Sequence, residues 1–281
     1  MQIGDYKLTV IDSGYFKLDG GAMFGIIPRP LWEKTNQPDN LNRIKLITRN
    51  LLLQGNGRNI LLDTGMGDKW DEKSRSIYDI DQNNISIQNG LLKGGLKPED
   101  ITDIILTHLH FDHTGGSTKI ENGKLIPTYP SAKYYVQKQN LDWAMNPTEK
   151  DRGSYIKDNF IPLIEAGVLE LLYGDTKFDK NIDLKVVNGH TFGQQLIKIS
   201  DSINTILYCG DLIPTASHIP LPYIMGYDLQ PIVTLSEKKN LLQKAADEKW
   251  MLYFEHDPDI IMATVSKTDK GFKVEKKYNE L

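Results

Sequence analysis

The sequence "ILTHLHFDHTGG", residues 105–116, holds three of the six histidines in a chain of 281 residues. We expect the apolar residues before it to form a strand that leads into His108 and His110, which then point the same way. A turn would bring Asp112 and His113 from another side. Isolated histidines are usually surface or core residues, but that explanation rarely accounts for four metal-competent side chains in six positions. The spacing predicts a site for two adjacent metal ions, and imidazole with carboxylate favours zinc or its transition-metal neighbours.

Three later apolar runs also end in metal-competent side chains. His190 follows "DLKVVNG", Asp211 follows "NTILYCG", and His256 follows "WMLYFE". Sheet proteins commonly place their chemistry at the carboxyl ends of strands, so we expect these three side chains to join the first group. Five of the six histidines then belong to one site, and His218 is the exception.

Composition narrows the classes of partner. The formal charge is −4, with 40% hydrophobic and 25% charged residues, which is ordinary for a globular protein and provides no basic surface for nucleic acid or anionic lipid. No apolar run is long enough to span a membrane. The N-terminus lacks the pattern of a secretory signal, and a single cysteine, Cys209, excludes an intramolecular disulfide. We therefore expect a cytoplasmic protein that acts on a small molecule.

Alternating strand and helix patterns predict one α/β domain spanning residues 1–281, with two sheets covered by helices. Residues 44–54 and 59–67 read as a β-hairpin, because the connection "GNGR" contains an Asn-Gly turn. Residues 20–32, rich in Gly and Pro, read as a loop. Helical patterns occupy residues 86–96, 138–145, 156–168 and 236–249.

Several motifs together resemble the metallo-β-lactamase superfamily: "THLHFDHTGG", "NGHTFG" around His190, "CGDL" around Asp211, the late His256, and "DTG" at residues 63–65. The resemblance implies a four-layer αββα sandwich with a binuclear metal site. It also implies the metal ligands, with His108, His110 and His190 on one ion, Asp112, His113 and His256 on the other, and Asp211 bridging them. In the family, the aspartate of the first motif, here Asp63, supports a ligand histidine from behind.

This site implies hydrolysis by a hydroxide that two divalent metal ions, expected to be zinc, share and activate. The hydroxide would attack a carbonyl carbon or a phosphorus atom. Asp211 would hold both ions, and Asp112 would carry the proton to the leaving group. Redox chemistry is disfavoured, because the related flavodiiron proteins have a glutamate where this chain has His110.

Two further segments resemble YtnP-type quorum-quenching lactonases, namely residues 19–32 and 220–231. This resemblance implies a lactonase that opens N-acyl homoserine lactones or related lactones. The apolar sequence "AMFGII" provides candidates for the wall of an acyl-chain pocket, with core filling as the alternative. These candidates are Met23, Phe24 and Ile26.

The chain departs from one lactonase pattern. Some acyl-homoserine lactonases carry a tyrosine three residues after the bridging aspartate, where it donates to the substrate carbonyl, but this chain has Pro214 there. Three side chains in the following loop are candidates to replace that tyrosine: His218, Tyr223 and Tyr227. For His218, a solvated loop histidine is the alternative interpretation.

Two other functions fit the same residues. A phosphotriesterase of the methyl parathion hydrolase type would use the same hydroxide on phosphorus, and a non-catalytic protein could bind metal on the same scaffold. Members of the family often form homodimers through an N-terminal loop, which makes "PRPLWEKTN", residues 28–36, a candidate dimer contact.

Overall fold

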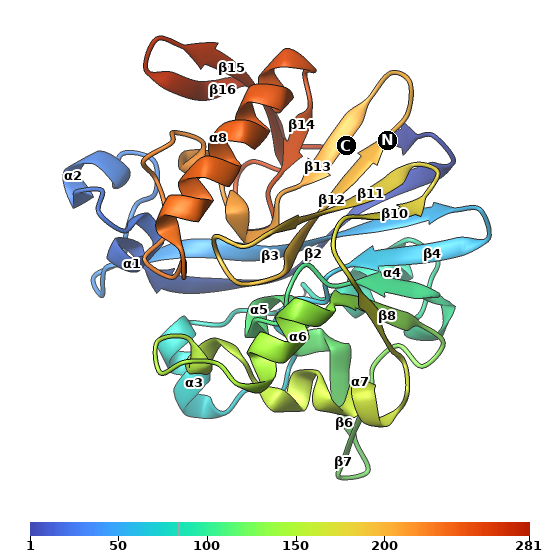
Figure 1. Ribbon diagram of the computed structural model, residues 1–281. Coiled ribbons are helices and arrows are strands. Elements are labelled where there is room, and N and C mark those ends of the chain that lie inside the picture. Colours follow the sequence, from blue (N-terminus) through green and yellow to red (C-terminus); the bar gives the residue numbers. More distant parts are fainter. Residues whose placement is uncertain (84) are drawn as a thin grey trace.

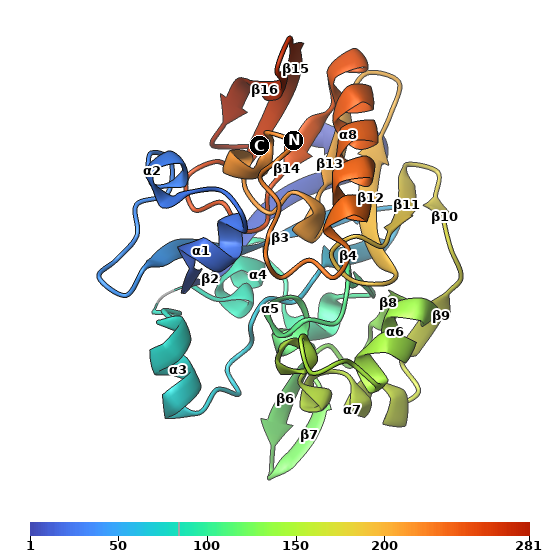
Figure 2. The same cartoon turned by 60° about the vertical axis from the view of Figure 1, so that its left-hand side comes forward.

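The computed structural model of the protein describes residues 1–83 and 85–281. Two seven-stranded β-sheets face each other, and helices cover the outer face of each sheet (Figure 1). Turning the molecule shows α8 along one outer face and α6 and α7 on the opposite side (Figure 2). The expected αββα sandwich is therefore confirmed.

The first sheet has the strand order β1-β2-β3-β4-β5-β8-β9, in which β4, β5, β8 and β9 run parallel and the other pairs antiparallel. Its strands are β1 Gln2–Ile3, β2 Tyr6–Asp19, β3 Arg43–Gly55, β4 Arg58–Leu62, β5 Asp103–Ile105, β8 Lys133–Gln137 and β9 Leu169–Leu172.

The second sheet follows chain order from β10 to β16, and only its β13–β14 pair is parallel. Its strands are β10 Thr176–Asp179, β11 Ile182–Val187, β12 Gln194–Ser200, β13 Thr205–Tyr208, β14 Met251–Tyr253, β15 Met262–Thr268 and β16 Gly271–Tyr278. A separate hairpin consists of β6 Thr118–Glu121 and β7 Lys124–Pro127.

The helices are mostly short. They are α1 Gly20–Phe24, α2 Arg29–Trp32, α3 Glu72–Tyr78, α4 Ile87–Lys93, α5 Phe111–Thr114, α6 Lys138–Met145, α7 Ile161–Glu165 and α8 Pro231–Asp247. None of the described helices combines the length and the apolar character that a bilayer crossing requires.

Three apolar layers hold the sandwich together. Leu53 and Ile60 of the first sheet pack with Ile197 and Ile206 of the second in the central layer. A second layer joins the first sheet to α4, α6 and α7, and a third joins the second sheet to α8. Burial of apolar surface on both faces of each sheet accounts for the near-continuous apolar runs in the strands.

The predicted hairpin is confirmed, since β3 and β4 pair antiparallel from Leu51–Leu62 to Gly55–Arg58. Asn56 and Gly57 form the turn, and both have positive φ angles, 51° and 70°. This is the backbone that a type I′ turn needs, which explains why an Asn-Gly pair occurs here.

Three local predictions were wrong. Residues 20–32 contain α1 and α2 rather than only loop, because the Asp19 side chain accepts a hydrogen bond from the Ala22 amide and starts a helix. The expected helix 156–168 shortens to α7 with a single 3₁₀ turn before it. β5 ends at Ile105, so His108 and His110 lie on the loop after the strand and their common direction does not come from strand alternation.

A buried arginine ties the two sheets together near the ends of their strands. Arg49 of β3 donates from Nη1 to the Asp257 carbonyl at 2.6 Å and from Nε to Asp12 Oδ1 at 2.8 Å, and its backbone amide donates to the Glu255 carbonyl. Only 3% of this residue is exposed. A buried guanidinium that satisfies carbonyls of the other sheet fixes how the segment around residue 256 meets β3.

We expect Arg49→Met to lower the free energy of unfolding by about 2–4 kcal/mol, because it leaves a buried carbonyl unpaired and removes a charged hydrogen bond. Urea unfolding followed by circular dichroism measures the loss. The matched control is Arg29→Met, whose guanidinium pairs with Glu33 on the surface. That change should cost about 0.5 kcal/mol or less, and equal losses for the two variants would contradict the inter-sheet role of Arg49.

Candidate metal centre

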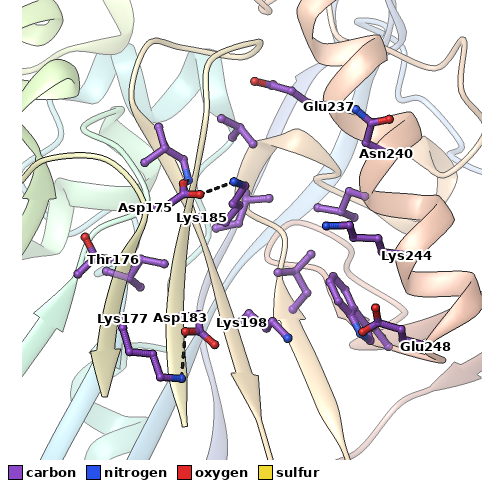
Figure 3. A pocket seen from close by; sticks show the side chains of 17 residues that line it. Asp175, Thr176, Lys177, Asp183, Lys185, Lys198, Glu237, Asn240, Lys244 and Glu248 are labelled. Carbon is purple, nitrogen blue, oxygen red and sulfur yellow. Dashed lines mark hydrogen bonds and ion pairs between the residues drawn. The ribbon is translucent and has the colours of Figure 1, made fainter. Parts of the chain in front are cut away.

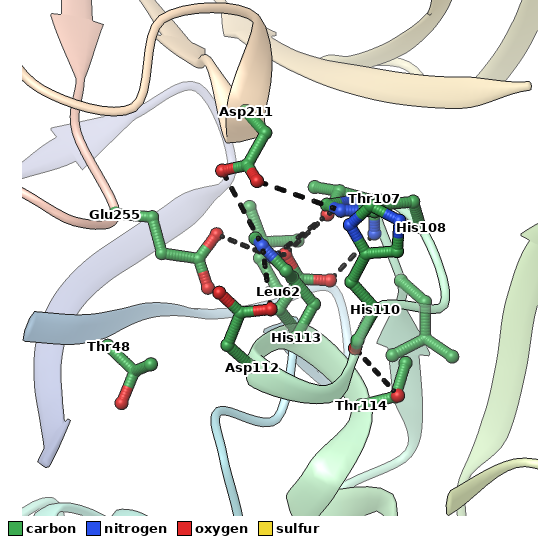
Figure 4. A network of polar contacts seen from close by, with 12 residues as sticks. Thr48, Leu62, Thr107, His108, His110, Asp112, His113, Thr114, Asp211 and Glu255 are labelled. Carbon is green, nitrogen blue, oxygen red and sulfur yellow. Dashed lines mark hydrogen bonds and ion pairs between the residues drawn. The ribbon is translucent and has the colours of Figure 1, made fainter. Parts of the chain in front are cut away.

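The histidine-rich segment leaves the end of β5 and turns at once into the short helix α5. His108 and His110 lie on the connecting loop, and α5 carries Asp112 and His113 (Figure 4). All four side chains are buried, with at most 7% of each residue exposed. The carboxyl end of a central parallel strand therefore presents four ligand-type groups at one edge of the first sheet.

The second sheet supplies the remaining groups from the ends of three strands. His190 follows β11, Asp211 lies in the 3₁₀ turn after β13, and His256 follows β14. These residues are also buried. The structure thus brings together all seven side chains that the sequence proposed as metal ligands, although they span residues 108–256.

The seven side chains form two neighbouring groups, and within each group one ligand atom per residue lies within 4.8 Å of the others. The first group contains His108, His110, His190 and Asp211, and the second contains Asp112, His113 and His256. This division is the one that the family resemblance implied for two separate ions.

Asp211 faces both groups with a different oxygen. Its Oδ2 lies 3.2 Å from His190 Nε2 and 3.8 Å from His108 Nε2. Its Oδ1 lies 3.1 Å from His256 Nε2 and 3.6 Å from His113 Nε2. A carboxylate with one oxygen toward each group is placed to bridge two cations.

Hydrogen bonds behind the imidazoles turn their Nε2 atoms inward. His190 Nδ1 donates to Asp228 Oδ1 at 2.9 Å, and His256 Nδ1 donates to the Ile47 carbonyl at 2.9 Å. His113 Nδ1 donates to Asp63 Oδ2 at 3.0 Å. Partners of this kind fix the tautomer and orientation of metal-ligating histidines.

Asp63 also holds the histidine loop itself. Its carboxylate accepts from the backbone amide and the hydroxyl of Thr107, both at 2.7 Å. The Thr107 hydroxyl donates its proton to Asp63, so its oxygen can accept a hydrogen bond from His108 Nδ1 at 3.0 Å. The proton of His108 is then on Nδ1, and Nε2 has a free lone pair.

Buried polar atoms without partners test whether metal ions fit this site. His108 Nε2 and Asp211 Oδ1 face the interior of the cluster, are buried and form no hydrogen bond. Buried polar atoms are normally hydrogen-bonded, so two orphaned acceptors in one cluster call for a positive ligand. The donor set of five imidazoles and two carboxylates suits divalent zinc or its neighbours.

The pKa values of the histidines in the site are shifted in opposite directions. Burial, reinforced by neighbouring imidazoles, lowers the pKa of His108 and of His110 well below the ordinary value. Burial also opposes charge on His113, but Glu255, Asp112 and Asp211 outweigh it and raise the pKa of this imidazole. Burial also opposes charge on His190 of the first group, but Asp211 and Asp228 outweigh it and raise the pKa of that imidazole.

Two carboxylates of this network were not foreseen from the sequence. Asp228 orients His190, and Glu255 places Oε2 3.1 Å from His113 Nδ1. Glu255 is fully buried, neither of its oxygens forms a hydrogen bond, and burial raises its pKa to about 8. Its position directly before His256 was the only available sequence signal.

A cavity of about 220 Å³ opens onto the cluster. His110, Asp112, His190, Asp211 and His256 line its floor. Apolar side chains cover much of its wall, and a few polar ones reach it from nearby loops: Phe16, Leu18, Met23, Leu46, Phe111, Met225, Tyr78, Lys150, Ser154 and Tyr227. Of the residues proposed to contact substrate, Met23 and Tyr227 reach this cavity.

The other four proposed contact residues lie elsewhere. Ile26 is 89% exposed and points to solvent, whereas Phe24 is fully buried behind the cavity wall. Tyr223 packs edge-on against Phe24. His218 is buried and hydrogen-bonded through both ring nitrogens, so it is neither a solvated loop histidine nor free to contact a ligand.

Two of the larger hollows lie away from the cluster, beside α8 and α6. One, of about 560 Å³, is enclosed by α8 and the outer face of the second sheet (Figure 3). Four of its eight charged side chains pair with one another, as Lys185–Asp175 and Lys177–Asp183. The other, of about 610 Å³, borders α6. Within residues 1–83 and 85–281, neither hollow holds a group of metal-competent side chains.

Comparison with known proteins gives a family match over most of the chain. The sequence profile of the Metallo-beta-lactamase superfamily matches residues 46–256. An N-acyl homoserine lactonase of Bacillus thuringiensis is 29% identical over 174 residues, which cover 61% of this chain and 62% of that protein. The chain therefore matches less than two thirds of the length of this curated relative.

Solved structures show the same architecture. A "probable metal-dependent hydrolase" from Staphylococcus aureus is 27% identical and superposes with a TM-score of 0.90, covering all of both chains. AidC, a dizinc quorum-quenching lactonase solved with the product N-hexanoyl-L-homoserine, is 22% identical with a TM-score of 0.82, covering 100% of this chain and 97% of AidC. At that identity, AidC supports the fold alone.

We expect Asp63→Asn to weaken metal binding by about 10- to 100-fold. An amide has one acceptor oxygen where Asp63 accepts three hydrogen bonds, so His113 or Thr107 loses its partner. Competition with a chromogenic chelator measures the affinity. Asp79→Asn is the matched control, because Asp79 also has a positive φ but is exposed. Equal affinities for the two variants would contradict the role assigned to Asp63.

Proposed function

The chain belongs to the metallo-beta-lactamase superfamily, and from that premise we propose that it is a binuclear metal-dependent lactonase. The proposed reaction opens the ring of N-acyl homoserine lactones or related lactones. One observation carries the proposal: Asp211 faces both groups of ligand-type side chains on the floor of a cavity whose wall is largely apolar. Such a site can activate water beside an electrophilic carbonyl that an acyl chain anchors.

The curated relative from Bacillus thuringiensis is an N-acyl homoserine lactonase, which supports this choice of substrate. The donor set of five imidazoles and two carboxylates supports the choice of metal. We therefore propose zinc for both ions, with His108, His110 and His190 holding one and Asp112, His113 and His256 the other. We also propose that residues 1–281 form one domain. The cytoplasmic location of the protein and its dimerisation through residues 28–36 remain predictions.

Two bound divalent ions would lower the pKa of a water molecule to about 7 and polarise the lactone carbonyl. The protein's own residues supply orientation and proton transfer. Asp112 lines the cavity, with one oxygen 3.8 Å from His113 Nε2 and the other 3.8 Å from His256 Nε2. From there its carboxylate can take a proton from water and return it to the alkoxide that leaves when the ring opens.

The rest of the cavity would hold the substrate. Met23, Leu46 and Met225 offer apolar surface to an acyl chain. Tyr227 reaches the same cavity, and its phenol, which is protonated at neutral pH, can donate a hydrogen bond. Among the three candidates for the missing tyrosine, Tyr227 is the one that lines the cavity, so we assign it to the substrate carbonyl.

We expect the zinc-loaded protein to release acid from N-acyl homoserine lactones, because ring opening produces a carboxylic acid that a pH indicator detects. Removing metal with a chelator should abolish turnover, and added zinc should restore it. Asp211→Ala should lose both metal and activity. If the protein hydrolyses a phosphotriester but no lactone, the phosphotriesterase hypothesis is favoured. If it binds two metal ions but hydrolyses no lactone, ester or phosphotriester, it is a metal-binding protein without this activity.

We expect Tyr227→Phe to reduce kcat/KM for lactones by about tenfold, because it deletes one hydrogen bond to the reacting carbonyl. Steady-state kinetics on the zinc-loaded variant measure the change, with metal content determined in parallel. The matched control is Tyr78→Phe, which removes a second phenol from the same cavity wall. A larger loss in Tyr78→Phe than in Tyr227→Phe would transfer the assignment to Tyr78.

A further inference from the structure

His218 is the one histidine outside the metal groups, and its ring is fully engaged. Nε2 donates to the Met23 carbonyl at 2.8 Å, and Nδ1 lies 2.8 Å from the Thr215 hydroxyl. A carbonyl can only accept, so the proton is on Nε2 and the Thr215 hydroxyl donates to Nδ1. This single tautomer links the loop after Asp211 to α1, 195 residues away in the sequence.

The His218 imidazole also contacts α1 by stacking on the ring of Phe24. The Phe24 ring lies parallel to His218, with centroids 4.7 Å apart and planes 5° apart. Phe24 also stacks on Trp32, at 5.4 Å and 10°. Phe24 therefore stacks with two rings, and aromatic pairs add to the stabilisation that burial alone provides.

The backbone beside this stack is closely fitted. The Gly226 amide donates to the Ala22 carbonyl at 2.8 Å. Gly25 has a φ of 56°, and a Cβ atom there would lie 2.4 Å from the Ile224 carbonyl oxygen. Residues 20–25 thus dock tightly on residues 215–226, and this contact places Met23 and Met225 together in the cavity wall.

We propose that His218 is a positioning residue that fixes the Met23 wall of the cavity and so determines which acyl chains the site accepts. The proposal rests on the proposed lactonase function for its choice of substrate. Methionine side chains are flexible and adapt to their surroundings, so a wall containing Met23 and Met225 has a defined shape only if its backbone is held. His218 holds that backbone at the Met23 carbonyl.

A cavity of about 220 Å³ is small for a ligand site, since drug-sized pockets range from about 300 to 1,000 Å³. A firmly held wall should therefore favour short acyl chains over long ones. Loosening the wall should reduce this discrimination without removing a metal ligand, because His218 belongs to neither ligand group.

Two substitutions of similar length test the proposal. In His218→Gln, the amide nitrogen can still donate to the Met23 carbonyl, whereas in His218→Met no donor remains. We expect the wild-type protein and His218→Gln to prefer butanoyl and hexanoyl over decanoyl homoserine lactone. In His218→Met, the ratio of kcat/KM between short and long chains should fall roughly tenfold, mainly through KM, while metal content stays unchanged.

Amide hydrogen exchange provides a readout that does not depend on turnover. Exchange in residues 20–27 should accelerate at least tenfold in His218→Met and stay close to wild type in His218→Gln, with α6 unchanged in both. If the protein opens no lactone, the proposed function fails, but the exchange data still decide whether His218 positions α1. Unchanged exchange in His218→Met would overturn the proposal.

A second variant covers the case in which His218→Met does not fold. Phe24→Leu approaches the same stack from the α1 side and leaves the His218–Met23 hydrogen bond intact. It should accelerate exchange in residues 20–27 and flatten the chain-length preference in the same direction. An unaltered chain-length profile together with unaltered exchange would contradict the role given to the stack.

Discussion

The structure depends on one shared charge, the Asp211 carboxylate, which is held in a nearly dry pocket between two sets of imidazoles. A buried carboxylate is costly unless cations or hydrogen bonds surround it. Here its two oxygens face different sets, and four histidines lie within 3.8 Å of it. The histidines that balance this charge lie at strand ends of both sheets, so these ends must meet at Asp211. The sandwich architecture brings the same strand ends together.

The fold meets that requirement by close backbone packing beneath the histidine loop. A Cβ atom on Gly115 would lie 1.9 Å from the Met66 carbonyl oxygen, and one on Gly116 would lie 2.2 Å from that of Thr64. Only glycine allows the loop to approach the segment after Asp63 so closely. The paired glycines in the motif thus place Asp63 behind His113, and the supporting carboxylate and the ligand are positioned by the same contact.

Local sequence patterns predicted that seven ligand-type side chains meet and that the domain has two sheets, because ligand chemistry and strand periodicity are legible within a few residues. The αββα layers were implied by the resemblance to the family. The resemblance implied the supporting role of Asp63, but the other two supporting carboxylates were not foretold. Asp228 meets His190, and Glu255 meets His113, only after distant segments have folded together. The role of His218 escaped for the same reason, since its partner is a backbone carbonyl far along the chain. The short helices of residues 20–32 form through the Asp19 cap and the docking of Phe24 and Trp32, which propensity does not reveal.

The division of the chain between the sheets has a mechanical consequence. The first sheet ends with β9 and the second begins with β10, and the link between them includes Tyr173, which is 78% exposed. Each of the two ligand groups draws side chains from both sides of that link. If the chain were cut there, each fragment would carry part of both ligand groups. A metal ion bound by residues of both fragments would stabilise their association. The same ions that serve chemistry would then act as cross-links between the halves.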